Sequence, residues 1–215
     1  MTDTAQLEAV IGTRNPGKIR EIETLLRGLR VILLSLTDFP NIPIVDEVGE
    51  TYEENSALKA LTYAKSTGLV TLADDSGLEV DALGGMPGPL SARYGGDFAS
   101  DSARTTKLLS ALDQKQNEPR TARYVCCLTL AGWVHPQQER NDEPGILRVT
   151  TANIEGQIAK EPRGLNGFGY DPVFVPIGHE LSLAELPVAV KNRISHRAQA
   201  VAAMRTFLER WLRQT

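Results

Sequence analysis

The sequence changes from apolar to acidic within the stretch Leu69-Val-Thr-Leu-Ala-Asp-Asp-Ser-Gly77. Its first five residues form an apolar run of strand length, which is typical of a buried strand in an α/β protein. We expect the polar residues that follow to lie at the end of this strand, where α/β proteins place their sites. Asp74 and Asp75 are therefore candidates to hold Mg²⁺ and to take a proton from water. An acidic turn without a catalytic role explains the same residues.

Strand and helix signals alternate on both sides of this stretch. Asn15 followed by Pro16 predicts the start of one helix. Thr51 with Glu54 forms the capping-box signature of another, which we expect to end near Gly68. The remaining signals predict strands at 9–12, 31–34, 69–73, 121–130, 147–158 and 173–175, a helix at 102–112, a last helix capped by Ser195, and inward-facing Leu58, Leu61 and Ala64 in the second helix. This mixture predicts an α/β fold with a mixed sheet and flanking helices.

Length and composition limit the kind of protein. The chain has 215 residues, of which 41% are hydrophobic, and its formal net charge is −4, so we expect one soluble domain over residues 1–215, whole or split into two lobes. A mildly acidic chain is a poor candidate for general nucleic-acid binding. Because residues 1–8 lack an apolar signal core and no apolar run has membrane-spanning length, we expect a cytoplasmic protein without membrane partners. The adjacent Cys126 and Cys127 are expected to be buried thiols.

The segment Thr13-Arg-Asn-Pro-Gly-Lys18 joins a predicted strand to a predicted helix. Backbone N–H groups at a helix start bind anions, and Gly17 would let a phosphate approach the chain. Lys18 lies in the first helical turn, where a cation is unfavourable unless an anion docks beside it. The segment lacks the glycine-rich P-loop pattern, and a plain turn with a surface lysine is the alternative.

Two further segments carry candidate binding residues. In Gly167-Phe-Gly-Tyr-Asp171, glycines on both sides of Phe168 would leave its ring accessible as a platform for stacking a base, or the aromatic residues pack inward. In Lys191-Asn-Arg-Ile-Ser-His-Arg197, the cations His196 and Arg197 follow a helix cap, where they oppose the helix dipole. A bound anion or the O6 acceptor of a purine would account for them, and a solvated basic segment is the alternative.

Together, and in this order, these segments resemble the inosine triphosphate pyrophosphatases, also called dITP/XTP pyrophosphatases. The matching strings span nearly the whole chain: 13–18, the acidic loop into Glu54-Asn55, 72–78, 80–88, Ser91-Ala-Arg-Tyr94, 167–174 and 194–197. The resemblance implies two α/β lobes around a long mixed sheet with the site in the central cleft, and a homodimer. It also implies Mg²⁺-dependent hydrolysis of ITP, dITP and XTP to the monophosphate and pyrophosphate, which clears deaminated purines from the nucleotide pool.

The resemblance also assigns roles to individual residues. Asp75 would be the proton acceptor and a magnesium ligand. The acidic loop, where the family often has a glutamate pair, would supply a further ligand; here it holds Asp46-Glu47, with Asp46 at the usual position, and both are candidates. The expected nucleotide contacts are Thr13, Arg14, Asn15, Pro16, Gly17, Lys18, Ser76, Phe168, Gly169, Tyr170, Asp171, Lys191, His196 and Arg197.

Two other functions compete with this interpretation. The related Maf-type pyrophosphatases act on pyrimidine or modified nucleotides, but their motifs fit less well at residues 194–197. A nucleotide-binding sensor without turnover would keep Phe168 and Lys18 but would not need Asp74 and Asp75. The polar loop at 135–147 matches nothing in the resemblance and is expected to be a peripheral hairpin tip.

Overall fold

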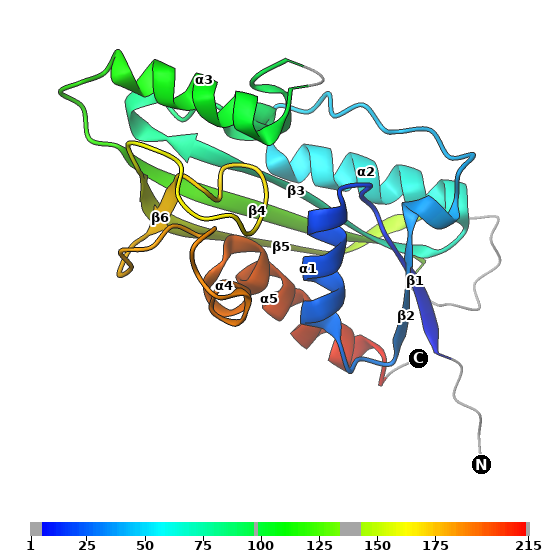
Figure 1. The fold of residues 1–215 in the computed structure, drawn as a ribbon. Coiled ribbons are helices and arrows are strands. Elements are labelled where there is room, and N and C mark those ends of the chain that lie inside the picture. The colour runs from blue at the N-terminus through cyan, green and yellow to red at the C-terminus, as the bar shows by residue number, and fades with distance from the viewer. Residues whose placement is uncertain (1–5, 97–98, 134–142, 214–215) are drawn as a thin grey trace. The chain divides into compact units, whose positions relative to one another are not determined.

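The computed structural model describes residues 6–96, 99–133 and 143–213, and it contains a mixed sheet flanked by helices (Figure 1). The strands are β1 (Leu7–Ile11), β2 (Val31–Ser35), β3 (Val70–Val80), β4 (Thr121–Gly132), β5 (Gly145–Ile158) and β6 (Phe174–Pro176). They form one six-stranded sheet in the order β2-β1-β3-β4-β5-β6. Because β1 pairs in parallel with β2 and β3, whereas β5 pairs antiparallel with β6, the predicted mixed α/β sheet is confirmed.

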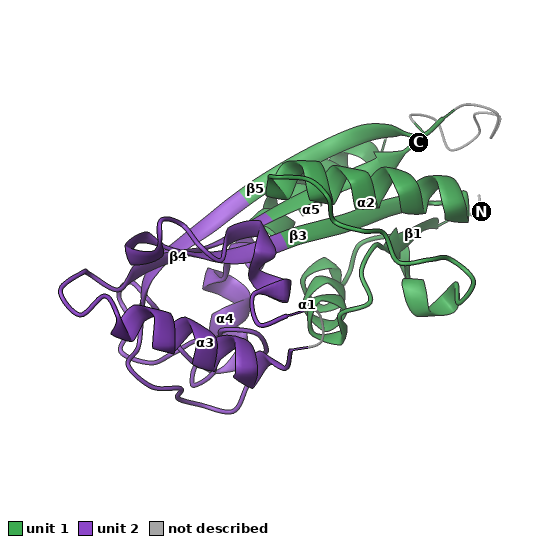
Figure 2. Ribbon diagram, turned by 90° about the horizontal axis from the view of Figure 1, so that it is seen from above, with its two compact units in different colours: residues 1–75, 127–151, 200–215 green, residues 76–126, 152–199 purple. Residues whose placement is uncertain are grey.

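The chain divides into two compact units (Figure 2). Unit 1 comprises residues 1–75, 127–151 and 200–215, and unit 2 comprises residues 76–126 and 152–199. The chain passes from one unit to the other inside β3, β4 and β5 and inside the last helix. Each unit is described by itself below.

The two helices of unit 1 that follow β1 and β2 begin as the sequence predicts. Helix α1 (Pro16–Leu26) has Asn15 as its N-cap, and the Asn15 side chain accepts hydrogen bonds from the N–H groups of the second and third helical residues. Helix α2 (Tyr52–Thr67) begins with the capping box of Thr51 and Glu54 and ends at Gly68 in the left-handed conformation, with φ 69°.

Strand β3 differs from the prediction. We expected it to end at Ala73, but it continues through Val80, so Asp74 and Asp75 lie within the strand and not at its end. Successive side chains of a strand point to opposite faces of the sheet, so these two carboxylates do not face each other. Polar residues remain inside this strand because nearby cations compensate both carboxylates.

Unit 2 has its own hydrophobic core under helix α3 (Asp101–Asp113), close to the helix predicted at 102–112. The core includes Leu78, Val80, Leu108, Leu112, Tyr124, Tyr170, Phe174 and Leu183. The segment at 84–96, which is dense in glycine and proline, contains a 3₁₀ helix at Gly88–Arg93.

The carboxyl-terminal part of the chain holds one helix that the sequence did not predict. Helix α4 (Val188–Ile194) contains Lys191, and it precedes the predicted last helix, α5 (His196–Trp211). The Ser195 hydroxyl accepts a hydrogen bond from the N–H of Ala198 at 3.1 Å, which confirms Ser195 as the cap.

Three smaller predictions have different outcomes. Cys126 and Cys127 are free buried thiols, as expected. Most of the predicted loop at 135–147 lies outside the described part of the chain, but residues 145–147 belong to β5 and are not loop. Across the described residues, the helices are too short or too polar to cross a membrane.

Gly12 provides a test of how closely β1 and β3 pack in unit 1. Its N–H donates to the carbonyl of Leu72 at 2.8 Å, and a Cβ at this position would lie 2.9 Å from the Cβ of Ala73. We expect Gly12→Ala to lower the free energy of unfolding by about 1–3 kcal/mol, measured by urea denaturation, because overpacking forces neighbouring atoms apart. Gly145→Ala is the matched control, since a Cβ there meets no atom within 4 Å. Equal stability changes in the two variants would contradict this packing.

Candidate functional site

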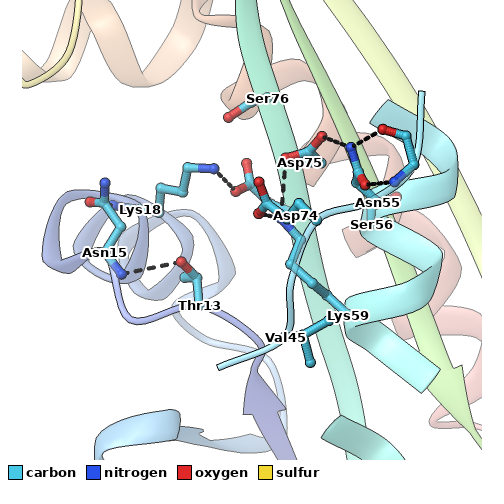
Figure 3. A network of polar contacts seen from close by, with 12 residues as sticks. Thr13, Asn15, Lys18, Val45, Asn55, Ser56, Lys59, Asp74, Asp75 and Ser76 are labelled. Carbon is cyan, nitrogen blue, oxygen red and sulfur yellow. Dashed lines mark hydrogen bonds and ion pairs between the residues drawn. The ribbon is translucent and has the colours of Figure 1, made fainter. Parts of the chain in front are cut away.

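One cluster of charged side chains surrounds the middle of β3 in unit 1 (Figure 3). On one face of the strand, the buried carboxylate of Asp74 lies 2.5 Å from the ammonium of Lys18, in the first turn of α1. The Lys18 side chain is only 16% exposed, so the surface-lysine alternative is wrong. The anion expected beside this helix start is, in the structure, the side chain of Asp74.

Asp75 faces the other side of β3 and contacts helix α2. Its Oδ1 lies 3.1 Å from the ammonium of Lys59, and its Oδ2 accepts a hydrogen bond from the amide of Asn55 at 3.3 Å. Asn55 and Lys59 are both buried, and they are four residues apart on one face of α2. Helix α2 therefore presents a polar face to the carboxylate of Asp75.

The acidic loop before α2 adds a second carboxylate to this cluster. The Glu47 carboxylate lies 2.5 Å from the ammonium of Lys59, so one lysine bridges Glu47 and Asp75. Asp46, by contrast, is exposed. The structure thus brings Glu47 close to Asp75, although the sequence register favoured Asp46.

Lys59 is a site residue that the sequence analysis missed. Lys59 could have been found because it lies four residues after Asn55, which is part of the matching strings. It was overlooked because the apolar residues of the helix were used to predict its buried face. Of the three residues expected to face inward, Ala64 is buried, as predicted, whereas Leu58 and Leu61 are only partly buried. Asn55 and Lys59, by contrast, are buried. The buried side of α2 is therefore mixed: Asn55 and Lys59 face the carboxylate of Asp75, while Ala60 and Ala64 pack in a hydrophobic cluster.

Burial and charge set the protonation of this cluster. Burial raises the pKa of Asp75 above its ordinary value, and the positive charges of Lys59 and Lys18 only partly offset this. Burial alone would lower the pKa of Lys59, but the charges of Asp75, Glu47 and Asp74 outweigh it and raise the pKa. Lys59 therefore stays protonated, while Asp75 is a stronger base than an exposed aspartate.

The turn between β1 and α1 is held by contacts within unit 1. The Asn15 side chain accepts the N–H groups of Gly17 and Lys18 at 2.8 and 3.2 Å. Thr13 accepts the N–H of Asn15 at 3.2 Å, and the exposed Arg14 donates to the carbonyl of Ile42 at 2.6 Å. Since Asn15 takes these two amide groups, the attraction of the turn for a phosphate rests mainly on the Lys18 ammonium and the helix dipole.

A second group of predicted residues gathers in unit 2 around Phe168, whose ring is partly exposed. The ammonium of Lys191 lies 5.0 Å from the centre of this ring, and the guanidinium of Arg197 lies 5.5 Å from it. Asp171 accepts hydrogen bonds from the Lys191 ammonium at 2.6 Å and from the Phe168 N–H at 2.9 Å. An aromatic ring with two cations beside it is suited to a flat ligand that carries hydrogen-bond acceptors.

The two aromatic residues of this turn differ in their surroundings. Tyr170 is buried, and its hydroxyl donates to the carbonyl of Ser91 at 2.9 Å. Its side chain therefore belongs to the core, as the alternative of inward packing proposed, whereas Phe168 stays partly exposed. Gly167 and Gly169 have φ of 77° and 63°, a conformation that side chains rarely adopt, which explains the glycines beside Phe168.

His196 and Arg197 are both buried, so the alternative of a solvated basic segment is wrong. The guanidinium of Arg197 donates to the hydroxyl of Ser76 at 2.9 Å. The His196 ring stacks on Tyr124, with ring centres 4.5 Å apart and planes 5° from parallel. Within unit 2, Arg197 thus contacts both Ser76 and Phe168, and the adjacent His196 packs on Tyr124.

Each unit thus brings together one part of the predicted site. Unit 1 holds Lys18, Asp74 and Asp75 with the unpredicted Lys59, and unit 2 holds the aromatic platform with its cations. Among the described side chains, no group of three or more histidines, cysteines, aspartates or glutamates is arranged to hold a metal ion. A metal at Glu47 and Asp75 would therefore take most of its ligands from substrate and water.

Known proteins with sequences similar to this chain are named as nucleotide pyrophosphatases. The dITP/XTP pyrophosphatase of Geobacter sulfurreducens is 48% identical over 200 residues, which cover 93% of this chain and 95% of that protein. The dITP/XTP pyrophosphatase of Bacillus subtilis is 41% identical over 202 residues, or 94% of this chain and 97% of that protein.

Solved structures extend the similarity to the fold. A HAM1 protein from Coxiella burnetii superposes with a TM-score of 0.82 at 41% identity, over 95% of this chain and 99% of that one. The Staphylococcus aureus Ham1 protein gives a TM-score of 0.78 at 36% identity, over 94% and 98%. The model of the Ham1 family matches residues 9–207, which include both clusters of site residues. The resemblance inferred from the motifs is thereby confirmed, and the chain belongs to the Ham1 family.

Proposed function

We propose that this protein is a nucleoside triphosphate pyrophosphatase that hydrolyses deaminated purine nucleotides (ITP, dITP and XTP) to the monophosphate and pyrophosphate. The observation that carries the proposal is the buried Asp75 on β3, a carboxylate of raised pKa held between Asn55 and Lys59. Chains 41–48% identical to this one are named dITP/XTP pyrophosphatases, which supports the same substrates.

Asp75 acts in this reaction as the general base. It accepts a proton from a water molecule, whose oxygen forms a bond to the α-phosphorus. The bond between the α-phosphorus and the α,β-bridging oxygen breaks, and pyrophosphate leaves with that oxygen. Lys18 neutralises charge on the phosphate chain, and Lys59 keeps the carboxylates of Asp75 and Glu47 in place.

The residues of unit 1 fit a magnesium ion as cofactor. Glu47 and Asp75 converge on a single ammonium group, so two carboxylates already meet where a cation is favourable. Two carboxylates are a usual protein contribution to Mg²⁺, which takes its other ligands from phosphates and water. When bound, the ion would neutralise phosphate charge and make a water molecule more acidic. Asp46 remains a second candidate ligand.

The residues of unit 2 account for the selection of the purine base of the substrate. Phe168 offers a ring on which a purine stacks, and its neighbours Lys191 and Arg197 supply hydrogen-bond donors. His196, which stacks on Tyr124 and directly precedes Arg197, is a further candidate donor. Hypoxanthine and xanthine carry an acceptor oxygen at C6, whereas adenine carries an amino group that would face these donors. Polar mismatches of this kind discriminate by about 10⁴. Guanine shares the C6 oxygen and would be rejected at C2.

The resemblance extends the proposal to the setting of the enzyme. We propose a cytoplasmic homodimer whose partners are small-molecule nucleotides, without nucleic-acid or membrane partners. The formal net charge of −4 supports this choice, since general nucleic-acid binding rests on positive charge.

A pyrophosphate-release assay with ITP, XTP, dTTP, ATP and GTP tests the proposed function. We expect turnover of ITP and XTP with kcat/KM far above that for ATP and GTP. Preference for dTTP would indicate a Maf-type enzyme, and nucleotide binding without pyrophosphate release would indicate a sensor.

Substitution of Asp75 tests its role as the base. We expect Asp75→Asn to lower kcat for ITP by about 10²- to 10⁴-fold, because the amide accepts no proton from water. Isothermal titration calorimetry should still detect ITP binding, since the phosphate and base contacts remain. Asp113→Asn, at the exposed end of α3, is the control and should keep its activity. A kcat near that of the unsubstituted enzyme in Asp75→Asn would rule out this assignment.

A matched pair of substitutions in the acidic loop identifies the second metal ligand. Glu47→Gln should raise the Mg²⁺ concentration required for half-maximal activity by about tenfold or more, since loss of one good ligand contact costs more than about 1.4 kcal/mol. Asp46→Asn should leave it almost unchanged, because Asp46 is exposed whereas Glu47 contacts Lys59. Magnesium titrations of pyrophosphate release measure both effects. The reverse order would assign the ligand to Asp46.

A further inference from the structure

Three consecutive N–H groups in the turn around Phe168 each donate to a side chain of unit 2. The N–H of Phe168 donates to Asp171 at 2.9 Å, and that of Gly169 donates to Asp101 at 2.6 Å. The N–H of Tyr170 donates to the hydroxyl of Tyr124 at 3.1 Å. These acceptors come from the turn itself, from helix α3 and from strand β4, so elements distant in sequence fix the turn.

Among these acceptors, Asp101 is distant in sequence and carries a formal charge. It lies 68 positions before Gly169, at the first residue of α3. A hydrogen bond from an N–H group to a carboxylate is stronger than one to a neutral oxygen. The Asp101 carboxylate thus ties the Gly169 N–H of the turn to the first residue of α3.

Asp101 is itself held in one orientation. The guanidinium of Arg104, one helical turn later, forms an ion pair with the other carboxylate oxygen of Asp101. Arg104 also donates to the carbonyls of Ala92 and Ala99, at 3.0 and 2.5 Å. These contacts already fix the Asp101 side chain. Its hydrogen bond with the Gly169 N–H therefore requires little further loss of side-chain entropy.

We propose that Asp101 is a positioning residue that fixes the Phe168 ring for stacking against the base. Gly169 directly follows Phe168, and its φ of 63° gives the turn its shape. Without the Asp101 contact, Gly169 regains its backbone freedom and the ring loses its fixed place beside Lys191 and Arg197. The proposal rests on the function proposed above, because it takes Phe168 as the platform for the purine.

The kinetic test separates positioning from a general loss of structure. We expect Asp101→Ala to raise KM for ITP by about 5- to 30-fold, as partial loss of base stacking predicts, with kcat within about twofold. Asp101→Asn keeps an oxygen that accepts the Gly169 N–H and should recover most of the affinity. Asp113→Ala, on the same helix, is the control and should match the unsubstituted enzyme. A fall in kcat without a change in KM, or no recovery in Asp101→Asn, would overturn the proposal.

Two further measurements do not depend on turnover. Calorimetry should show weaker IMP binding in Asp101→Ala with pyrophosphate binding unchanged, because only IMP carries a base. Amide hydrogen exchange should become faster at Gly169 in Asp101→Ala but not in Asp113→Ala. Unchanged exchange at Gly169 would refute the positioning contact even if the enzyme hydrolyses ITP. Faster exchange with no change in IMP binding would refute the link to the base. Failure of the unsubstituted enzyme to hydrolyse ITP would instead refute the proposed function.

Discussion

Two adjacent carboxylates lie inside a buried strand, and each must be matched by a cation. Asp74 is paired with Lys18 from α1 on one face of β3, and Asp75 is paired with Lys59 from α2 on the other. Removing one partner of a buried ion pair costs about 3–5 kcal/mol, because the remaining charge is left without compensation. Within unit 1, these ion pairs fix the first turn of α1, through Lys18, and the middle of α2, through Lys59, against β3.

The same pairing leaves the cluster rich in negative charge. Lys59 lies among Asp75, Glu47 and Asp74, so a single ammonium serves several carboxylates. Burial raises the pKa of Asp75, and the positive charge of the shared Lys59 is too weak to bring this pKa back to its ordinary value. A carboxylate in this state is suited to accept a proton from water, and the excess charge is what a divalent cation bound with a phosphate chain would neutralise.

The sequence predicted the parts of the fold that depend on local chemistry. The caps at Asn15, Thr51 and Ser195 and the mixed α/β sheet were all predicted, because short-range hydrogen bonds and periodicity decide them. The length of β3 was not predicted. Adjacent acidic residues favour a turn unless lysines from other parts of the sequence compensate their charges. For the same reason Lys59 was missed, because its partners come from other elements, and the resemblance named Asp46 without showing which side chain of the acidic loop points toward Asp75.

Hydrolysis of ITP in ¹⁸O-labelled water tests the central claim most directly, namely that the cluster around Asp75 directs water to the α-phosphorus. The account predicts inosine monophosphate and pyrophosphate in equal amounts, with one ¹⁸O atom in the monophosphate and none in the pyrophosphate, as read by mass spectrometry. Label in the pyrophosphate would place the attack at the β-phosphorus. Formation of the diphosphate with labelled orthophosphate would place it at the γ-phosphorus. Either result would contradict the mechanism.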